Sequence, residues 1–279
     1  RRYGVEVNKR VGTRRSEVDQ QFEEYSTWRK GLFNAISDFR VWLQTQELSD
    51  VQADQRLDQV LSTLRDDKLY VAFVAEFSRG KSELINAIFF ANFGQRVLPS
   101  AAGRTTMCPT ELMYERNTDP FIRLLPIETR ANGTTVSELK GFPEEWITVP
   151  LDVKSPDNVT QALQHIAEIK TVTKEQAQAM GLHVAEEETQ NGMQMTQDGK
   201  VEIPKWRHAM INFPHPLLEQ GLVILDTPGL NALGTEPELT LSLLPSAHAV
   251  LFILAADAGV TKSDIQVWHD FISPPKRTP

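Results

Sequence analysis

The sequence predicts an α/β fold with a mainly parallel sheet, preceded by a helical segment. Continuous apolar runs of strand length occur at residues 69–74, 222–225 and 249–254, as expected for strands that are covered on both faces. Helical patterns at residues 83–90 and 238–244 lie between these runs. The order strand, helix, strand, helix, strand is typical of a parallel α/β sheet.

The residues before the first apolar run are predicted to form two helices. Apolar side chains recur every three or four positions from Val18 to Trp42, which indicates an amphipathic helix with Ser16 as its expected N-cap. Residues 49–64 repeat the pattern, so this second helix is expected to pack on the first. Residues 1–15 are rich in arginine and are expected to be a basic solvated tail, with contact to an acidic membrane surface as the alternative.

Composition excludes several protein classes. The chain has 279 residues, of which 41% are hydrophobic and 24% are charged, as in ordinary globular proteins. The net charge of −8 argues against general nucleic-acid binding. The longest apolar run, residues 249–256, is much shorter than the roughly 20 residues of a membrane helix. The single cysteine, Cys108, excludes an internal disulfide and favours a reducing, cytoplasmic setting.

Residues 121–207 differ from the rest of the second part because they are mixed and polar, and we interpret them as an insertion. Short strand patterns are expected at residues 121–125 and 146–149, helices at residues 156–169 and 174–179, and a loop or hairpin at residues 186–200.

The strand at residues 69–74 runs directly into a phosphate-binding motif that contains Gly-Lys-Ser and opens a helix. Backbone N–H groups and the helix N-terminus bind phosphates, and Gly80 lets the backbone approach them closely. Lys81 neutralises the β- and γ-phosphates, and the Ser82 hydroxyl ligates Mg²⁺. The expected nucleotide-binding residues are Glu76, Phe77, Ser78, Arg79, Gly80, Lys81, Ser82 and Glu83.

One position departs from the consensus of this motif, because Ala75 replaces the first glycine. Alanine resists positive φ, which costs about 1 kcal/mol where that conformation is needed. The departure weakens the motif without cancelling it.

A second motif follows the apolar run at residues 222–225, where Asp226 to Gly229 read Asp-Thr-Pro-Gly. Ligands bind at the carboxyl ends of parallel strands, so Asp226 is expected to hold Mg²⁺ through water and the Gly229 N–H to sense a γ-phosphate. A plain β-turn is the alternative. Both motifs in this order predict a nucleotide switch on a three-layer P-loop NTPase fold.

Residues 98–112 form a third element, a loop of small and polar residues between the two motifs. Thr106 follows Ser82 by 24 positions (106 − 82), which suits a segment that carries a threonine to the metal.

The three motifs together resemble the GTPase domain of the bacterial dynamin-like proteins, over about 60 of the 279 residues. They read Glu-Phe-Ser-Arg-Gly-Lys-Ser, then Leu-Pro-Ser with Thr-Thr-Met-Cys-Pro-Thr, and then Leu-Asp-Thr-Pro-Gly-Leu-Asn. The resemblance implies GTP and Mg²⁺ as cofactors, a neck- or stalk-like role for residues 16–66, and a GTPase domain at residues 67–279. It implies that Thr106 is the switch threonine, with Thr105 and Thr110 as rivals. The implied catalytic residues are Ser78, Lys81, Thr106 and Gly229, and the implied metal ligands are Ser82, Thr106 and Asp226.

The same resemblance implies a function and partners. GTP hydrolysis would be coupled to dimerisation, as a homodimer or hetero-oligomer through the GTPase face, and to membrane remodelling or tethering through parts outside this chain. The implied location is cytoplasmic, with peripheral attachment at the inner face of the membrane left open, and no nucleic acid is expected as a partner.

One residue departs from the eukaryotic dynamins, which carry a catalytic glutamine where this chain has Phe77. Phenylalanine cannot orient water, so hydrolysis is expected to be slow or to use other groups, such as Arg79 or Arg104. The alternative function is therefore a nucleotide-gated regulatory scaffold with little or no hydrolysis. A ribosome-associated GTPase is a further alternative, which the acidic charge and the N-terminal helices argue against.

Thr261-Lys262-Ser263-Asp264 matches the guanine-reading pattern [Asn/Thr]-Lys-x-Asp, and we reject the match. The interval after Gly229 holds one helix and one strand where two of each are needed, and Asp264 is expected to be an N-terminal helix residue. The chain is therefore expected to be cut short before its base-specificity motif. The six histidines show no ligand spacing and are assigned no role.

Overall fold

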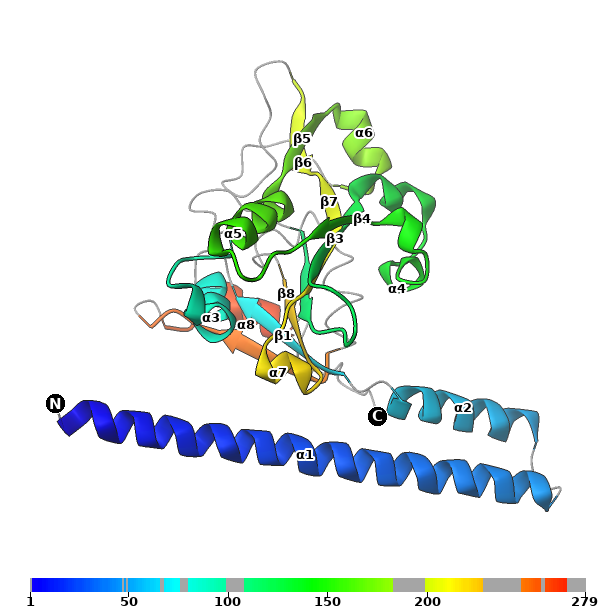
Figure 1. Ribbon diagram of the computed structural model, residues 1–279. Helices are drawn as coiled ribbons and strands as arrows, with labels where there is room; N and C mark the ends of the chain where they lie inside the picture. The colour runs from blue at the N-terminus through cyan, green and yellow to red at the C-terminus, as the bar shows by residue number, and fades with distance from the viewer. Residues whose placement is uncertain are drawn as a thin grey trace. The chain divides into compact units, whose positions relative to one another are not determined.

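The computed structural model describes residues 2–46, 48, 50–65, 68–75, 80–98, 108–182, 199–227, 247–256 and 259–269 (Figure 1). The chain divides into two compact units, Arg1–Lys68 and Leu69–Pro279. The helix expected at residues 238–244 and nearly all of the loop expected at residues 186–200 lie outside the described residues.

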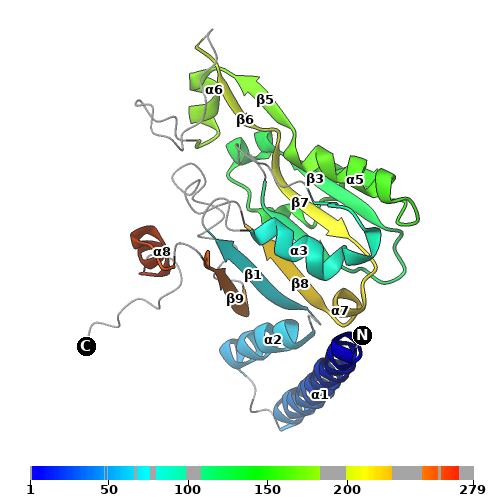
Figure 2. The ribbon, with the colours of Figure 1, turned by 90° about the vertical axis from the view of Figure 1, so that its left-hand side faces the viewer.

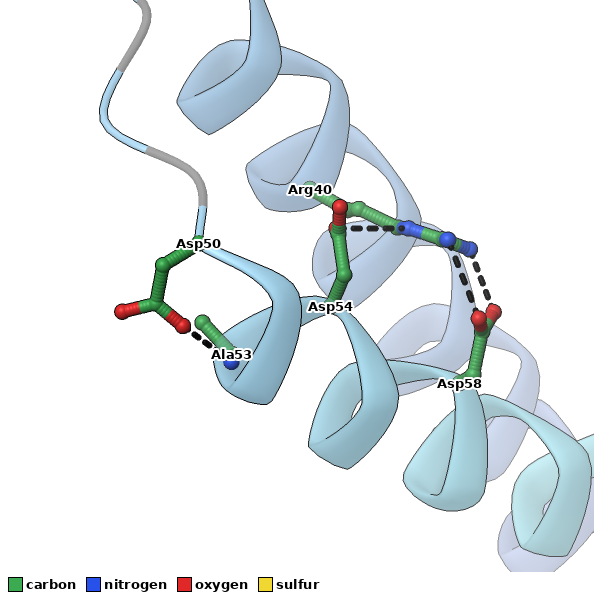
Figure 3. Close-up of polar contacts among 5 residues, drawn as sticks. All are labelled: Arg40, Asp50, Ala53, Asp54 and Asp58. Carbon is green, nitrogen blue, oxygen red and sulfur yellow. Dashed lines mark hydrogen bonds and ion pairs between the residues drawn. The ribbon is translucent and has the colours of Figure 1, made fainter.

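The first unit is a pair of helices, α1 (Arg2–Thr45) and α2 (Val51–Arg65). Arg40 of α1 joins them, because its guanidinium contacts Asp54 Oδ1 at 3.3 Å and both carboxylate oxygens of Asp58, at 2.5 and 3.1 Å (Figure 3). At the start of α2, the Asp50 carboxylate accepts a hydrogen bond of 2.7 Å from the Ala53 N–H, which caps the helix. The packing of the second predicted helix on the first is confirmed.

Helix α1 begins at Arg2, so the prediction of Ser16 as its N-cap is wrong. The segment interpreted as a solvated tail, residues 1–15, is helical from Arg2 onward. Arginine, lysine and glutamate are good helix formers, and the segment contains no proline that would end a helix. The apolar stripe therefore does not mark where the helix begins.

The second unit is built on a seven-stranded sheet with the order β4-β3-β7-β2-β8-β1-β9. Its strands are β1 (Leu69–Ala75), β2 (Thr110–Met113), β3 (Phe121–Pro126), β4 (Ile147–Pro150), β7 (Trp206–Asn212), β8 (Leu222–Asp226) and β9 (Ala249–Ile253). Strand β1 lies between β8 and β9 and is parallel to both, and β2 is parallel to β7. Antiparallel pairs join β2 to β8, β3 to β7 and β3 to β4.

Helices cover both faces of this sheet, which confirms the predicted α/β fold. Side chains from α3 (Lys81–Phe89), α5 (Pro156–Gln164) and α7 (Pro216–Glu219) enter a core on one face, and Figure 2 shows α3 and α5 on the same side of the strands. On the other face, Leu139 of α4 (Val136–Leu139) packs with Trp146, Met210 and Leu225. Helix α8 (Lys262–Val267) follows β9. The 3₁₀ helices are η1 (Ala91–Phe93), η2 (Ile127–Asn132), η3 (Pro143–Glu145) and η4 (His165–Ala167).

A second, two-stranded sheet pairs β5 (Ile169–Val172) with β6 (Val201–Pro204), and α6 (Lys174–Ala179) packs beside it (Figure 1). Its own core includes Ile127, Leu182 and Ile203. The segment interpreted as an insertion, residues 121–207, therefore has two parts. Strands β3 and β4 belong to the main sheet, whereas β5 and β6 form the separate two-stranded sheet. The helix expected over residues 156–169 ends at Gln164, because the chain turns through η4 and enters β5.

Within the described residues, no helix combines the length and the apolar character that crossing a membrane requires.

Candidate functional site

The candidate site lies at the carboxyl end of β1, where the chain leads into α3. Gly80 precedes α3 with φ 83° and ψ 15°, a left-handed conformation that favours glycine. Its carbonyl oxygen accepts the first hydrogen bond of the helix, from Leu84 N at 2.9 Å. The helix therefore starts directly at Lys81, and its N-terminal N–H groups are free of intrahelical partners, as phosphate binding requires.

Ala75 is the last residue of β1 and is fully buried. Among the described residues, Asn117 is the non-glycine residue with positive φ. The conformational cost expected for alanine at position 75 therefore does not arise, because the position is part of the extended strand.

Lys81 and Asp226 bring the two predicted motifs together. Because β1 and β8 are parallel and pair Phe73 with Asp226, both strands end at the same edge of the sheet. From the start of α3, Lys81 Nζ lies 2.8 Å from Asp226 Oδ1, and these side chains are only 12% and 11% exposed. The two residues lie 145 positions apart (226 − 81), so this contact is a product of the fold.

The surroundings of Asp226 fix its position. Thr227 is buried, and its hydroxyl donates a hydrogen bond of 2.9 Å to the carbonyl oxygen of Phe73, which ties the end of β8 to β1. On the other side, the antiparallel register of β2 and β8 places Thr110 opposite Asp226. The Thr110 hydroxyl donates to the Cys108 carbonyl at 3.1 Å. Thr110, one of the alternative candidates for the switch threonine, therefore lies beside Asp226, and its hydroxyl proton is hydrogen-bonded to the backbone.

The chemistry of these groups fits a hydrated Mg²⁺. Asp226 Oδ1 is buried, and in the part of the chain that the structure describes it accepts no aligned hydrogen bond beside the ion pair with Lys81. Ser82, next to Lys81, supplies a hydroxyl on the same helix turn. The described residues contain no group of three or more histidine, cysteine or acidic side chains that could hold a metal ion.

The other predicted site residues fall partly inside and partly outside the described part of the chain. Glu83 is described, and it pairs at the surface with Arg96, whose Nε lies 3.1 Å from Glu83 Oε1. The predicted residues that lie outside the described part are Glu76, Phe77, Ser78, Arg79, Arg104, Thr105, Thr106 and Gly229.

Asp264 is the third residue of α8 and forms a capping box with Thr261. Its Oδ2 accepts from the Thr261 N–H at 2.8 Å, and its own N–H donates to Thr261 Oγ1 at 3.2 Å. These contacts agree with the interpretation of Asp264 as an N-terminal helix residue.

Sequence reasoning missed a charged cluster behind the site. Glu111 of β2 is buried, and both of its carboxylate oxygens accept from Lys140 Nζ, at 2.6 and 2.9 Å. His208 Nε2 of β7 lies 3.1 Å from Glu111 Oε1. Burial favours a higher pKa for Glu111, but the hydrogen bonds and charges of His208 and Lys140 lower its pKa to about 2. The sequence signal for this cluster was Glu111 itself, a charged residue in the short segment Thr110–Met113 that follows Pro109.

Asn86 was missed as well. Its side chain is buried on α3 and is bonded to the backbone of residues 97–98. The signal was a polar residue within the apolar pattern Leu84-Ile85-Asn86-Ala87-Ile88.

Comparison with known proteins matches the profile of the Dynamin family to residues 71–277. A curated relative, "Bacterial dynamin-like protein" of Nostoc punctiforme, is 24% identical over 200 residues. That alignment covers 71% of this chain and 22% of the relative, so the chain spans about a fifth of the relative's length.

Two similar solved structures carry titles that describe an oligomerised bacterial dynamin pair and the long-range sensing and tethering of membranes. They have TM-scores of 0.41 at 13% and 15% identity, and the matches cover 85% and 86% of this chain and 35% of each solved chain.

Proposed function

Because the chain belongs to the Dynamin family, we propose that it is a GTPase that binds GTP with Mg²⁺ and hydrolyses the terminal phosphoric anhydride bond. The observation that carries the proposal is the contact between Lys81 and Asp226, one residue from each of two nucleotide-binding motifs.

The charges of this pair are complementary to a magnesium nucleotide. The Lys81 ammonium would bind the β- and γ-phosphates, and the Asp226 carboxylate would hold water on Mg²⁺. Since both side chains are mostly buried, each needs a partner of opposite charge, and they supply this to one another at 2.8 Å. A magnesium-bound triphosphate offers each of them a replacement partner, so binding would not leave a buried charge unpaired.

The remaining roles follow the family's pattern. Residues 76–83 would surround the phosphates, and Ser82, Thr106 and Asp226 would hold Mg²⁺, directly or through water. The metal would neutralise negative charge on the phosphates when bound. Ser78, Lys81, Thr106 and Gly229 would stabilise the transferring group and orient the attacking water.

We further propose that hydrolysis is coupled to dimerisation, as a homodimer or a hetero-oligomer through the GTPase face, and to membrane remodelling or tethering. Residues 16–66 would form a neck- or stalk-like segment that transmits motion from a GTPase domain at residues 67–279. The proposed location is cytoplasmic, with peripheral attachment at the inner face of the membrane left open. Membership of the Dynamin family supports these proposals.

Phe77 favours a second candidate function, a nucleotide-gated scaffold with little hydrolysis. Eukaryotic dynamins carry a catalytic glutamine at the matching position, and a phenylalanine side chain cannot orient the attacking water.

Single-turnover hydrolysis of GTP by the full-length protein distinguishes the GTPase from the scaffold. The rate is measured with and without liposomes, and the Lys81→Ala variant gives the background rate. Hydrolysis above this background in either condition is the result expected of the GTPase. GTP binding without hydrolysis in both conditions would favour the scaffold, and failure to bind GTP would contradict both.

A further inference from the structure

Asn86 links α3 to the chain at the start of the predicted switch loop, residues 98–112. Its Oδ1 accepts hydrogen bonds from the backbone N–H groups of Val97, at 3.1 Å, and Leu98, at 2.8 Å. Its Nδ2 donates to the carbonyl oxygen of Leu98 at 3.1 Å. The side chain is only 7% exposed, and Val97 and Leu98 are buried in the same core. One side chain therefore fixes two successive peptide groups.

Asn86 lies on the same helix as the proposed phosphate- and metal-binding residues, one turn further along. Asn86 follows Ser82 by four positions (86 − 82), so the two side chains lie on the same face of α3, one turn apart. Ser82 is the proposed Mg²⁺ ligand of that helix. The backbone at residues 97–98 is thus held one helical turn from the metal-binding end of α3.

We propose that Asn86 is a positioning residue for GTP hydrolysis. It anchors the chain that enters the segment containing Thr106 to the same helix that carries Lys81 and Ser82. The inference rests on the proposed function, because it assigns Asn86 a role in that reaction. Loss of the anchor is expected to slow the chemical step, which needs Thr106 in place, more than it weakens binding of GDP, which depends on the phosphate loop.

The chain contains a matched control in Asn212, which is also buried and also makes three hydrogen bonds to backbone groups. Its Oδ1 accepts from Glu115 N at 2.8 Å, and its Nδ2 donates to the carbonyl oxygens of Thr118, at 3.3 Å, and Asp119, at 3.1 Å. Asn212 pairs with Met113, whereas the other end of β2, at Thr110, pairs with Asp226. It therefore lies at the end of β2 that is remote from the nucleotide site.

The test compares Asn86→Ala with Asn212→Ala in the full-length protein, by thermal melting, GDP affinity and single-turnover GTP hydrolysis. Each variant loses three backbone hydrogen bonds, so similar decreases in melting temperature are expected. Only Asn86→Ala is expected to lower the hydrolysis rate, by about tenfold or more, with GDP affinity changed by less than about twofold. Asn86→Asp keeps the two acceptor contacts, so it should retain more of the rate, and it provides the comparison if Asn86→Ala does not fold.

Equal rates for Asn86→Ala and the wild type, or equal losses for the two alanine variants, would overturn the inference while leaving the proposed GTPase intact. Absence of hydrolysis in the wild type would instead be a failure of the proposed function. A loss of GDP affinity in Asn86→Ala as large as the loss of rate would also overturn the inference, because it would mean general damage to the phosphate loop.

Discussion

At the scale of single residues, the backbone of Gly80 is the feature on which the proposed phosphate loop depends most directly. Its φ of 83° is costly for any residue with a Cβ, and a Cβ built there meets no atom within 4 Å. The substitution Gly80→Ala therefore tests the cost of the left-handed backbone conformation alone, because the added methyl group would overlap no neighbouring atom.

We predict that Gly80→Ala lowers GTP affinity by about tenfold, because about 1–2 kcal/mol of strain must be overcome to keep the left-handed conformation. Titration calorimetry with GTP and Mg²⁺ measures this. The same substitution at Gly31, inside helix α1, should instead stabilise the first unit, by about 0.5–1 kcal/mol. Unchanged GTP affinity in Gly80→Ala would contradict the role of this conformation.

At this scale, the sequence marks the residues whose chemistry is local. Gly80, Lys81 and Ser82 are consecutive, and Asp226 is marked by the strand that it ends, so their meeting follows from the order of parallel strands. Asn86 and Glu111 were missed because their roles depend on partners elsewhere in the chain. Glu111 and His208 are 97 residues apart, and no local pattern records such a pair.

At the scale of elements, the contact between Glu111 and Lys140 joins β2 to the end of α4. The Glu111 side chain is 4% exposed and the Lys140 side chain 32%. A carboxylate this deeply buried needs its cation, since an unpaired buried charge is strongly destabilising.

We predict that Lys140→Met lowers the free energy of unfolding at pH 7 by about 3 kcal/mol, measured by urea denaturation. Lys205→Met is the control, because its ion pair with Glu168, at 2.7 Å, involves side chains that are 46% and 32% exposed. Removing that surface pair should cost no more than about 1 kcal/mol. Adding Glu111→Gln to Lys140→Met should recover part of the loss; equal losses for the two single lysine variants would contradict the importance of burial.

The same cluster predicts a pH dependence. The pKa of Glu111 is about 2 in the folded protein against 4.5 for an ordinary glutamate, so its contribution is fully present above pH 4.5 and is lost as the pH falls toward 2. Removal of the Lys140 charge raises the pKa of Glu111, so Lys140→Met should lose this contribution at a higher pH than the wild type. Acid unfolding curves followed by circular dichroism measure the difference, and coincident midpoints would argue against it.

Element prediction worked for strands that are apolar throughout, such as β1 and β8. Strands β2 and β7 were not predicted, although both lie inside the sheet. Polar residues interrupt their patterns: Thr110 and Glu111 in the first, and Arg207 and His208 in the second. These side chains are buried with partners supplied by the fold, which hydropathy alone cannot reveal.

At the scale of the whole molecule, the order of the motifs was more informative than the length or composition. A strand, a phosphate loop and an Asp-x-x-Gly strand predicted an α/β nucleotide-binding fold, and the structure places Lys81 and Asp226 at one edge of its sheet. The division near residue 68 follows a change from helical to strand periodicity. The two-stranded sheet of β5 and β6 was not predicted, because its pairing joins segments separated by α6 and by residues 183–198.

The central claim is that Lys81 binds the phosphates of GTP, and the most direct test is the affinity of the full-length protein for a fluorescent GTP analogue with Mg²⁺. We predict that Lys81→Ala weakens binding by about 100-fold or more, since a charge-assisted contact to the phosphates is lost in a mostly buried site. Lys205→Ala, which removes a surface lysine, should bind as the wild type does. An unchanged dissociation constant for Lys81→Ala would contradict the assignment of the nucleotide site.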